Sequence, residues 1–452
     1  MRAAALAAVG AVGALGACGG VTGTYSLELT TAPGSTVLDG VARARLTLTT
    51  PYRQVEATRG GDGKFHLDLE VPANGPAGFV VFEGFDAAGA LVGWGRSAPL
   101  PIAAVDATIA IYVAPPQSLA AAPEALDPPR RDFGVAAFSF GPVLIGGTGA
   151  DGAVLDTVDV YDLYGHALVP GADLPAPRTA PSAAAGDVGY AYVYGGNGSD
   201  GQPTGTLWRF DTQVDPRGVW QQLDSDPLLA RADAAMTQVG PEVFLATGAP
   251  AAVIDGRTVN VTGATTLPAL AGTATSVALD DLFYAAFVGD GSGDGGIVIV
   301  GADGVTQPVT PPASALRTGH GAAATIDDKV VVIGGEVAGV PTREALVLDP
   351  VNGAGVEARP DVLATPRVGA AVGGNGRVIV VAGGRDAGGA LVADAEIFDA
   401  ATLAPIATVP LVVPRADASA IPLANGQIMI AGGVDAAGAP IATIELYTPA
   451  TP

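Results

Sequence analysis

One repeated segment constrains the fold of this chain more than any other feature. Residues 379–400 read IVVAGGRDAGGALVADAEIFDA, and residues 428–449, forty-nine positions later, read IMIAGGVDAAGAPIATIELYTP, identical at 10 of the 22 positions. Each copy holds a short apolar strand that ends in Gly-Gly, a loop rich in Gly and Asp, and a second strand with an aromatic residue near its end. Recurrence at a fixed period predicts an array of equivalent units that bury their faces against one another.

Earlier copies carry VLIGG, AYVYGG and VVVIGG, and two weaker ones carry EVFLATG and LFYAAFVG. Successive units are 49, 52, 41, 46, 49 and 49 residues apart when measured between the markers Gly147, Gly196, Gly248, Gly289, Gly335, Gly384 and Gly433. Units of this length predict an all-β fold, a seven-bladed β-propeller. A six-bladed ring is the alternative, because the third and fourth units are eroded.

The repeat resembles the kelch motif, whose hallmarks are a double glycine, an aromatic residue after a variable loop, and a later tryptophan. Trp220 stands where the motif has its tryptophan, and the aromatic residues are Tyr161, Phe210, Phe398 and Tyr447. The resemblance runs from Arg130 to the end of the sequence. It implies a kelch-type propeller of the superfamily that includes galactose oxidase.

The last unit stops after its third strand, TIELYTP, so the ring needs a strand from elsewhere. Residues 117–129 look like the fourth strand of the other units. We therefore expect the propeller to span residues 116–452, with residues 117–129 completing the last blade and closing the ring.

The segment before the repeats predicts a separate small domain over residues 24–115. Apolar and polar residues alternate in FHLDLEV, residues 65–71, as in a half-buried strand. GFVVFEGFDAAGALVGWG reads as two strands around a turn at Asp86. YSLELTT, ARLTLTT and TIAIYV add further strands, which favours an immunoglobulin-like or transthyretin-like β-sandwich.

Composition excludes one large class of function. The chain has 452 residues and a formal net charge of −23, with 49% hydrophobic residues. An acidic surface repels phosphate backbones, so a nucleic-acid partner is excluded. We expect a monomer whose partner is a protein or a glycan.

The N-terminus predicts where in the cell the protein is located. A short apolar run follows Arg2 and ends in Leu15-Gly16-Ala17-Cys18, which resembles the lipobox of bacterial lipoproteins. That resemblance implies removal of residues 1–17, acylation of Cys18, and a linker over residues 18–23. Gly19 favours the outer membrane, on its periplasmic or cell-surface side, with membrane contact through the lipid alone. An ordinary signal peptide is the alternative.

Basic residues recur at the entry to first strands, once per unit except the fourth. We expect this set to surround one mouth of the channel, where it would either capture an anionic group or brace the loops of neighbouring blades. His320 lies near the same position in its unit and is a candidate for ligand binding or for a structural hydrogen bond. The arginines are Arg131, Arg178, Arg231, Arg317, Arg367 and Arg415.

Metal and cofactor signals are weak. Asp290, Ser292 and Asp294 resemble the start of a calcium loop, but the closing carboxylate is absent, so a surface loop is the alternative. Two GxGxxG matches precede strands rather than helices and predict no nucleotide site. The resemblance to galactose oxidase implies a Cys–Tyr cross-link with copper, which a chain with Cys18 as its single cysteine cannot form. We expect no cofactor and no catalytic residue set.

These observations favour a lipid-anchored cell-envelope protein whose propeller is a scaffold for protein or carbohydrate binding. The alternative is a periplasmic propeller enzyme that acts on a sugar, similar to the kelch-type sialic acid mutarotases. A scaffold without a small ligand is a third possibility. The residues that line the central channel of the propeller distinguish a binding scaffold from an enzyme. Polar residues there favour an enzyme, whereas a channel filled by Ala and Val disfavours one.

Overall fold

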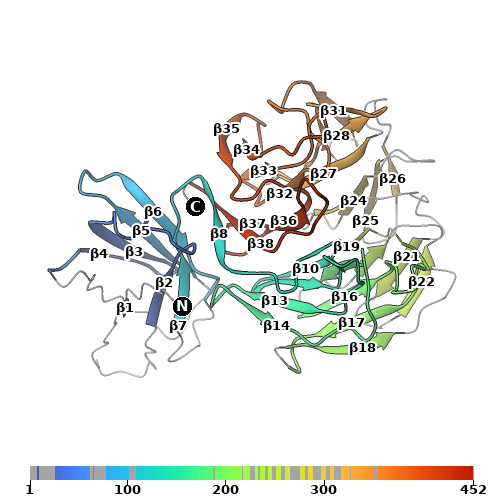
Figure 1. Ribbon diagram of the computed structural model, residues 1–452, viewed down its shortest axis with the longest axis horizontal. Helices are drawn as coiled ribbons and strands as arrows, with labels where there is room; N and C mark the ends of the chain where they lie inside the picture. The colour runs from blue at the N-terminus through green and yellow to red at the C-terminus, as the bar shows by residue number, and fades with distance from the viewer. Residues whose placement is uncertain are drawn as a thin grey trace.

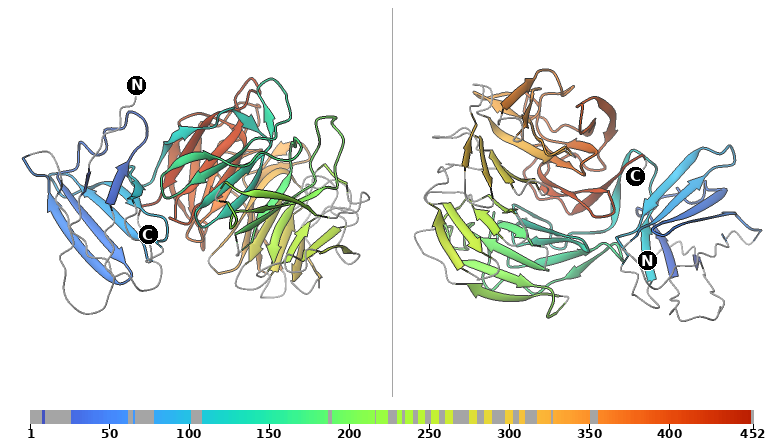
Figure 2. Two further views of the ribbon diagram at one scale, coloured as in Figure 1. Left: turned by 90° about the horizontal axis from the view of Figure 1, so that it is seen from below. Right: turned by 180° about the vertical axis from the view of Figure 1, so that it is seen from behind.

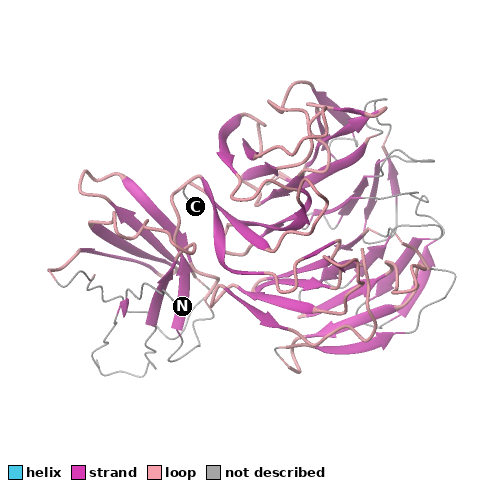
Figure 3. Ribbon diagram, viewed as in Figure 1, coloured by secondary structure: helices cyan, strands magenta, loops and turns pink. Residues whose placement is uncertain are grey.

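The computed structural model contains strands and loops and no helix among the residues that it describes (Figure 3), so the predicted all-β class is confirmed. The described residues are 8–9, 26–61, 65, 78–100, 108–186, 189–215, 217–223, 230–232, 235–239, 243–246, 251–255, 260–264, 275–279, 284–288, 297–301, 306–309, 317–325, 327–349 and 355–450.

Seven antiparallel sheets of the described chain follow one another around a ring (Figures 1 and 2). We number them blade 1 to blade 7 in chain order and list their strands from the first, innermost strand outward. Blade 1 holds β10 (Gly134–Phe138), β11 (Gly141–Ile145), β13 (Val158–Asp162) and β14 (Ala167–Pro170). Blade 2 holds β15 (Ser182–Ala185), β16 (Tyr190–Tyr194), β17 (Leu207–Asp211) and β18 (Val219–Leu223). Blade 3 holds β19 (Met236–Val239), β20 (Val243–Ala246), β21 (Ala251–Asp255) and β22 (Asn260–Ala264).

The remaining blades follow the same order. Blade 4 holds β23 (Thr275–Leu279), β24 (Tyr284–Val288), β25 (Ile297–Gly301) and β26 (Thr306–Pro308). Blade 5 holds β27 (Thr318–Ala324), β28 (Val330–Val337), β30 (Ala345–Asp349) and β31 (Gly355–Arg359), with β29 (Val340–Pro341) paired to β28. Blade 6 holds β32 (Ala371–Gly374), β33 (Val378–Ala382), β34 (Asp394–Asp399) and β35 (Pro405–Pro410). Blade 7 holds β36 (Ala416–Pro422), β37 (Ile428–Val434), β38 (Thr443–Thr448) and, outermost, β8 (Ser118–Ala125).

The outermost strand of blade 7 comes from the N-terminal side of the ring. β8 pairs antiparallel with β38, with Ser118 opposite Thr448 and Ala121 opposite Glu445. The first and last segments of the propeller therefore share one sheet. Immediately after β8, the short strand β9 (Arg130–Arg131) pairs with β12 (Thr148–Gly149) and begins blade 1.

Apolar side chains of neighbouring blades form shared cores. Val143 and Ile145 of blade 1 pack with Val193 and Trp208 of blade 2 in one buried cluster. Equivalent clusters join blades 4 and 5, 5 and 6, 6 and 7, and 7 and 1. A single blade exposes two faces, so burial between neighbours is what makes each blade stable.

The N-terminal domain holds two sheets that enclose a core containing Leu46, Phe82 and Ile111. The hairpin predicted around Asp86 is confirmed, because β5 pairs antiparallel with β6 across that turn. Only Phe65 of the predicted strand 65–71 lies among the described residues, and it is buried in this core. The sheets are β4 (Tyr52–Thr58), β3 (Arg43–Thr49), β5 (Val80–Phe85) and β6 (Leu91–Arg96); and β1 (Ala8–Val9), β2 (Ser26–Thr30) and β7 (Thr108–Tyr112).

The N-terminal domain packs against blades 7 and 1, beside β8 (Figure 1). Ala98 and Tyr112 of this domain share a buried cluster with Leu144 of blade 1 and Met429 of blade 7. The contacting loops join first to second strands and third to fourth strands, as in Asn425, whose Nδ2 donates to the carbonyl oxygen of Arg96 at 3.3 Å. The loops at the opposite ends of the blade strands are left outside this contact.

Candidate functional site

Four of the six recurring arginines bind the carbonyl oxygen of the first glycine in the Gly-Gly pair of their own blade. The distances from Nη1 are 2.9 Å for Arg178 to Gly195, 3.2 Å for Arg317 to Gly334, 3.2 Å for Arg367 to Gly383, and 3.0 Å for Arg415 to Gly432. These four arginine residues are at most 3% exposed. Their guanidinium groups therefore lie inside the blades and are not presented at the channel mouth.

The main chain of the same arginines reaches the preceding blade. The N–H of Gly384 in blade 6 donates to the carbonyl oxygen of Arg415 at 2.8 Å, and the N–H of Gly335 in blade 5 does so to Arg367 at 2.9 Å. Arg367 and Arg415 each join two consecutive blades in this way, and we call this arrangement the arginine bracket. Of the two roles that the sequence left open, these contacts correspond to bracing between blades. The guanidinium group binds within its own blade, and the main-chain carbonyl group binds the preceding one.

Carboxylates complete the bracket in blades 5, 6 and 7, and those of Glu396 and Glu445 are buried. Arg415 pairs with Glu445 at 2.7 Å, and Glu445 also accepts from the main-chain N–H groups of Val412 and Val413. Arg367 pairs with Glu396 at 2.5 Å in the equivalent place, and Arg317 pairs with Glu344 at 2.7 Å. Burial lowers the pKa of Arg415 and of Arg317, and the carboxylate partner of each acts in the opposite direction.

Blade 2 has no carboxylate at this place. Trp208 stands there, and the guanidinium carbon of Arg178 lies 4.1 Å from its ring centroid. Burial lowers the pKa of Arg178 to about 10, because this cation is desolvated with no acid beside it. A cation–π contact replaces the ion pair.

In blade 1 the sequence prediction chose the wrong neighbour. Arg130, not Arg131, takes the bracket position: it is fully buried and pairs with Asp159 at 2.7 Å. Arg131 is part-exposed and pairs with Asp132. Spacing is the signal that distinguishes them, because bracket arginines precede the first glycine by 16 or 17 residues and Arg130 lies 16 before Gly146.

The last two predicted residues have local contacts. Arg231 donates from Nε to the hydroxyl of Tyr194 at 3.2 Å. His320 lies in β27, and its Nδ1 is 3.0 Å from the carbonyl oxygen of Arg317, which suits the structural reading of this histidine. The structure therefore does not gather the predicted set into one ligand site.

The Gly-Gly pair is required because the bracket fills the space around it. Gly383 and Gly384 have φ of 64° and 91°, in the left-handed region. A Cβ on Gly383 would meet the carbonyl oxygen of Arg415, and a Cβ on Gly384 would lie 2.8 Å from that of Val368. Both neighbours are main-chain atoms, so a side chain is excluded at either position.

Four charged residues from blades 6, 7 and 1 interact electrostatically, and only Arg131 among them was predicted from the sequence. Asp417 and Asp132 both stand two residues after a bracket arginine and have φ of 57° and 55°. Partial desolvation raises the pKa of Asp417, which Arg385 lowers and Asp132 raises. We call Arg131, Asp132, Arg385 and Asp417 the mouth cluster.

The innermost strands of blades 1, 2 and 6 consist mostly of small side chains without acidic or basic groups. β15 reads SAAA, β32 reads AVGG and β10 reads GVAAF. Small residues let the blades approach the axis closely. Acid and base groups near the axis come instead from the strand entries.

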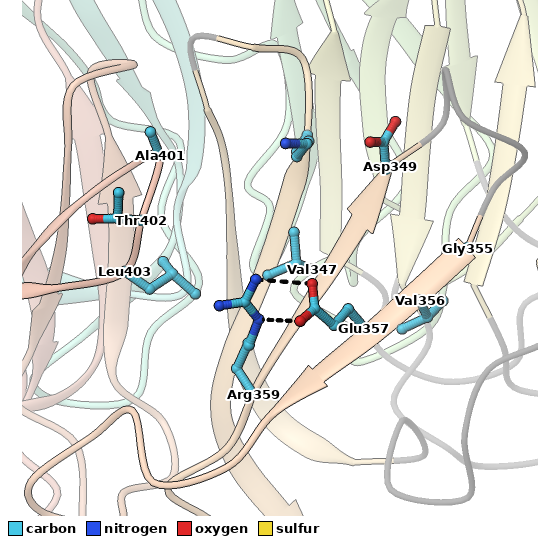
Figure 4. Close-up of a pocket in the computed structure, with 10 residues that line it drawn as sticks. Val347, Asp349, Gly355, Val356, Glu357, Arg359, Ala401, Thr402 and Leu403 are labelled. Atoms are coloured by element: carbon cyan, nitrogen blue, oxygen red, sulfur yellow. Dashed lines mark hydrogen bonds and ion pairs between the residues drawn. The ribbon is translucent and has the colours of Figure 1, made fainter.

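Two of the cavities among the described residues are lined by propeller residues alone. A cavity of about 390 Å³ lies between blades 5 and 6, lined by Glu357, Arg359 and Leu403 (Figure 4). Arg359 is paired with Glu357 at 2.5 Å there, so its charge is already balanced. A second cavity of about 690 Å³ lies along the exposed loop of blade 2 that contains Asp200.

A third cavity of about 630 Å³, the interdomain cleft, separates the N-terminal domain from blades 6 and 7. Phe79, Trp94 and Arg96 line it from the N-terminal domain, and Arg377 and Tyr447 line it from the propeller. The guanidinium carbon of Arg96 lies 3.5 Å from the ring centroid of Phe79.

His166, on the loop between β13 and β14, joins the N-terminal domain to blade 1. It is 1% exposed, its Nε2 accepts from the N–H of Tyr112 at 3.3 Å, and its Nδ1 lies 3.0 Å from the hydroxyl of Tyr161. Burial lowers the pKa of His166 to about 3, so the ring is neutral. The contacts fix the tautomer, because Nε2 must be the acceptor and Nδ1 the donor.

Cys18 and the calcium candidates Asp290, Ser292 and Asp294 lie outside the described residues. Within the described ranges, no three His, Cys, Asp or Glu residues lie close enough together to hold a metal ion. Copper chemistry of the galactose oxidase kind does not fit this chain, since its single cysteine lies outside the propeller segment. No described helix is long and apolar enough to cross a bilayer.

Comparison with one solved structure supports the fold. The chain superposes on a fungal alcohol oxidase of the AA5 family, solved in complex with copper, with a TM-score of 0.53 and 15% identity over 71% of this chain and 74% of the other. It also matches the structure of YjhT with a TM-score of 0.44 and 16% identity over 70% of this chain and 94% of that one. No family model and no curated protein matches the sequence. The strand order and this superposition thus define an all-β propeller.

Proposed function

We propose that this protein is a lipid-anchored, non-catalytic binding protein of the bacterial cell envelope, whose propeller presents loops to a protein or glycan. The observation that supports this proposal is the hydrogen bonding within the loop that joins the second to the third strand of a blade. In blade 6, Oδ1 of Asp386 accepts from the N–H groups of Gly388 and Ala390 at 2.8 and 3.0 Å. In blade 7, Asp435 makes the same two bonds at 2.8 and 2.9 Å.

Loops of this kind are ordered before a partner arrives, which reduces the entropy lost on binding. They lie at the strand ends opposite to those that the N-terminal domain contacts, so a partner can reach them. The arginine brackets support the same conclusion, because the recurring cations that catalysis would have used are occupied by main-chain and carboxylate oxygens.

The test is a glycan array and capture of envelope proteins by the chain begun after Cys18. We expect the double variant Asp386→Ala and Asp435→Ala to lose binding to the hit without a change in melting temperature. Asp86→Ala is the matched control, because Oδ1 of Asp86 holds the same turn in the N-terminal domain, at 2.9 and 2.8 Å. Equal binding by the loop variant and the control would contradict the proposed surface.

The anchor needs its own experiment. We expect the full chain to incorporate a labelled fatty acid and to sediment with membranes, and Cys18→Ala to do neither. Incorporation by Cys18→Ala would contradict the lipid anchor and leave the loop surface to be judged separately.

A sugar-converting enzyme is the second candidate, favoured by the mouth cluster. A carboxyl group with a raised pKa, as in Asp417, is suited to general acid or base chemistry when cations lie near it. NMR measurement of the rate at which sialic acid anomers interconvert tests this candidate. Acceleration that Asp417→Asn abolishes would support the enzyme, and an uncatalysed rate would oppose it.

A further inference from the structure

Two arginines, Arg96 and Arg377, line the interdomain cleft. Arg96 extends from β6 and Arg377 from the loop before β33, so the two cations come from different domains. Neither forms an ion pair within the described part of the chain. Burial lowers the pKa of Arg96 first, and the positive charge of Arg377 lowers it further.

A carboxylate also lines the cleft but is held elsewhere. Oδ1 of Asp399 accepts from the main-chain N–H and from the hydroxyl of Thr402 at 2.9 and 2.7 Å. This acid therefore orders its own turn. The two arginines line one cleft in a protein with a formal net charge of −23, where cations normally have many acids to pair with.

Two buried donors in the cleft lack a partner among the described residues. They are Nε of Arg96 and Nε1 of Trp94, and the Trp94 residue is 1% exposed. Unpaired buried donors reduce stability, and an acceptor that enters the cleft would remove that cost. Phe79, Trp94 and Tyr447 add ring surfaces to the walls.

We propose that the interdomain cleft binds a small organic anion that carries a carboxylate beside a ring. The two guanidinium groups bind the carboxylate, whose two oxygens match their planar forks, and the aromatic walls contact the ring. A volume of about 630 Å³ is within the range of small-molecule sites. This site lies at the strand ends opposite to the loop surface of the proposed function and does not depend on it.

Two sources share this chemistry, a sugar acid and an aromatic acid, and glucuronate and benzoate are the probes that distinguish them. Calorimetric titration of the chain begun after Cys18 is expected to detect at least one probe. Glucose and benzyl alcohol are the uncharged counterparts and are expected not to bind. Because the walls come from two domains, the bound probe is also expected to raise the melting temperature.

Arg377 is exposed, so Arg377→Ala removes one cation with little risk to folding. We expect it to weaken binding roughly 10- to 100-fold, the effect of losing a charged hydrogen bond. Arg96→Lys keeps the charge but not the fork and is expected to weaken binding as well. Arg53→Ala, an exposed arginine on β4, changes the same charge outside the cleft and is expected to bind like the parent chain.

Three results would overturn the proposal: no binding of either acid, equal binding of an uncharged counterpart, or binding that Arg377→Ala leaves unchanged. Inorganic phosphate that binds as tightly as the ring acids would also overturn it, since the aromatic walls would then contribute nothing.

Discussion

At the scale of single residues, the bracket explains why glycine and arginine recur together. The guanidinium of Arg415 needs the carbonyl oxygen of Gly432, and the carbonyl oxygen of Arg415 needs the N–H of Gly384. The carbonyl oxygen of Arg415 occupies the space where a Cβ on Gly383 would lie. A repeat propagates such residues because each one serves the joint between two units. Recurrence in this chain therefore marks structure before it marks a ligand.

The bracket predicts a large loss of stability when its cation is removed. Arg415→Ala leaves Glu445, which is fully buried, without its partner and is expected to lower the free energy of unfolding by about 3–5 kcal/mol. Urea unfolding followed by tryptophan fluorescence measures the change. Arg53→Ala removes an exposed arginine and is expected to change it by less than about 0.5 kcal/mol.

A stable Arg415→Ala chain with impaired ligand binding would reverse this interpretation of the recurring arginines. The double variant Arg415→Met with Glu445→Leu separates charge from packing. We expect it to be more stable than Arg415→Ala, because no unpaired charge remains buried.

At the scale of elements, sequence patterns predicted the strands better than they predicted the sites. The glycine markers that are described, such as Gly147 and Gly384, lie at the ends of second strands, because the Gly-Gly pair has the same place in each of these blades. The bracket residue of blade 1 was mistaken, since Arg130 and Arg131 are adjacent and the prediction used their place before the first strand rather than their spacing to Gly146. The set was expected at the channel mouth because sequence gives position along the strand and not the direction of a side chain.

The interdomain cleft could not be predicted at all. Phe79, Arg96, Arg377 and Tyr447 are far apart in the sequence and belong to no common motif. They meet because the N-terminal domain packs on blades 7 and 1, and that packing follows from a shared apolar cluster rather than from any repeat. Contacts between a repeated and a non-repeated domain leave no periodic signal.

The contact between β7 and the loop before β14 predicts a dependence on pH. His166 has its pKa lowered to about 3 by burial, below the value near 6.5 of an unfolded chain. The folded protein thus binds fewer protons than the unfolded one between these values, so stability is full above about pH 6.5 and falls as the pH decreases toward 3. Protonation of Nε2 also breaks its bond with the N–H of Tyr112.

Unfolding free energies measured at several pH values test this dependence, with a contribution of up to about 1.4 kcal/mol per pH unit from one such histidine. His166→Gln is expected to be less stable near neutral pH and to have a shallower slope between pH 6.5 and 3. His320→Gln is the control, because His320 lies on the first strand of blade 5, away from the domain contact. An unchanged slope in His166→Gln would contradict the assignment.

At the scale of the whole molecule, closure depends on a strand that lies more than 300 residues from its partner. β8 pairs with β38 and covers an edge that would otherwise be open. It also carries Ala122, which packs with Met429 and Leu446 of blade 7. Loop closure over such a length has an entropic cost, so the ring is closed only while β8 holds its place.

Two shortened chains test closure. Both lack the N-terminal domain, and one begins at residue 116 whereas the other begins at residue 130, so they differ in β8 alone. We expect the shorter chain to melt at a lower temperature, because β38 loses its partner strand and the apolar cluster between blades 7 and 1 becomes exposed. The exposed edge should also promote association, which light scattering detects. Equal melting temperatures for the two chains would mean that the ring is stable without β8, and closure would then have to come from the contacts between the innermost strands.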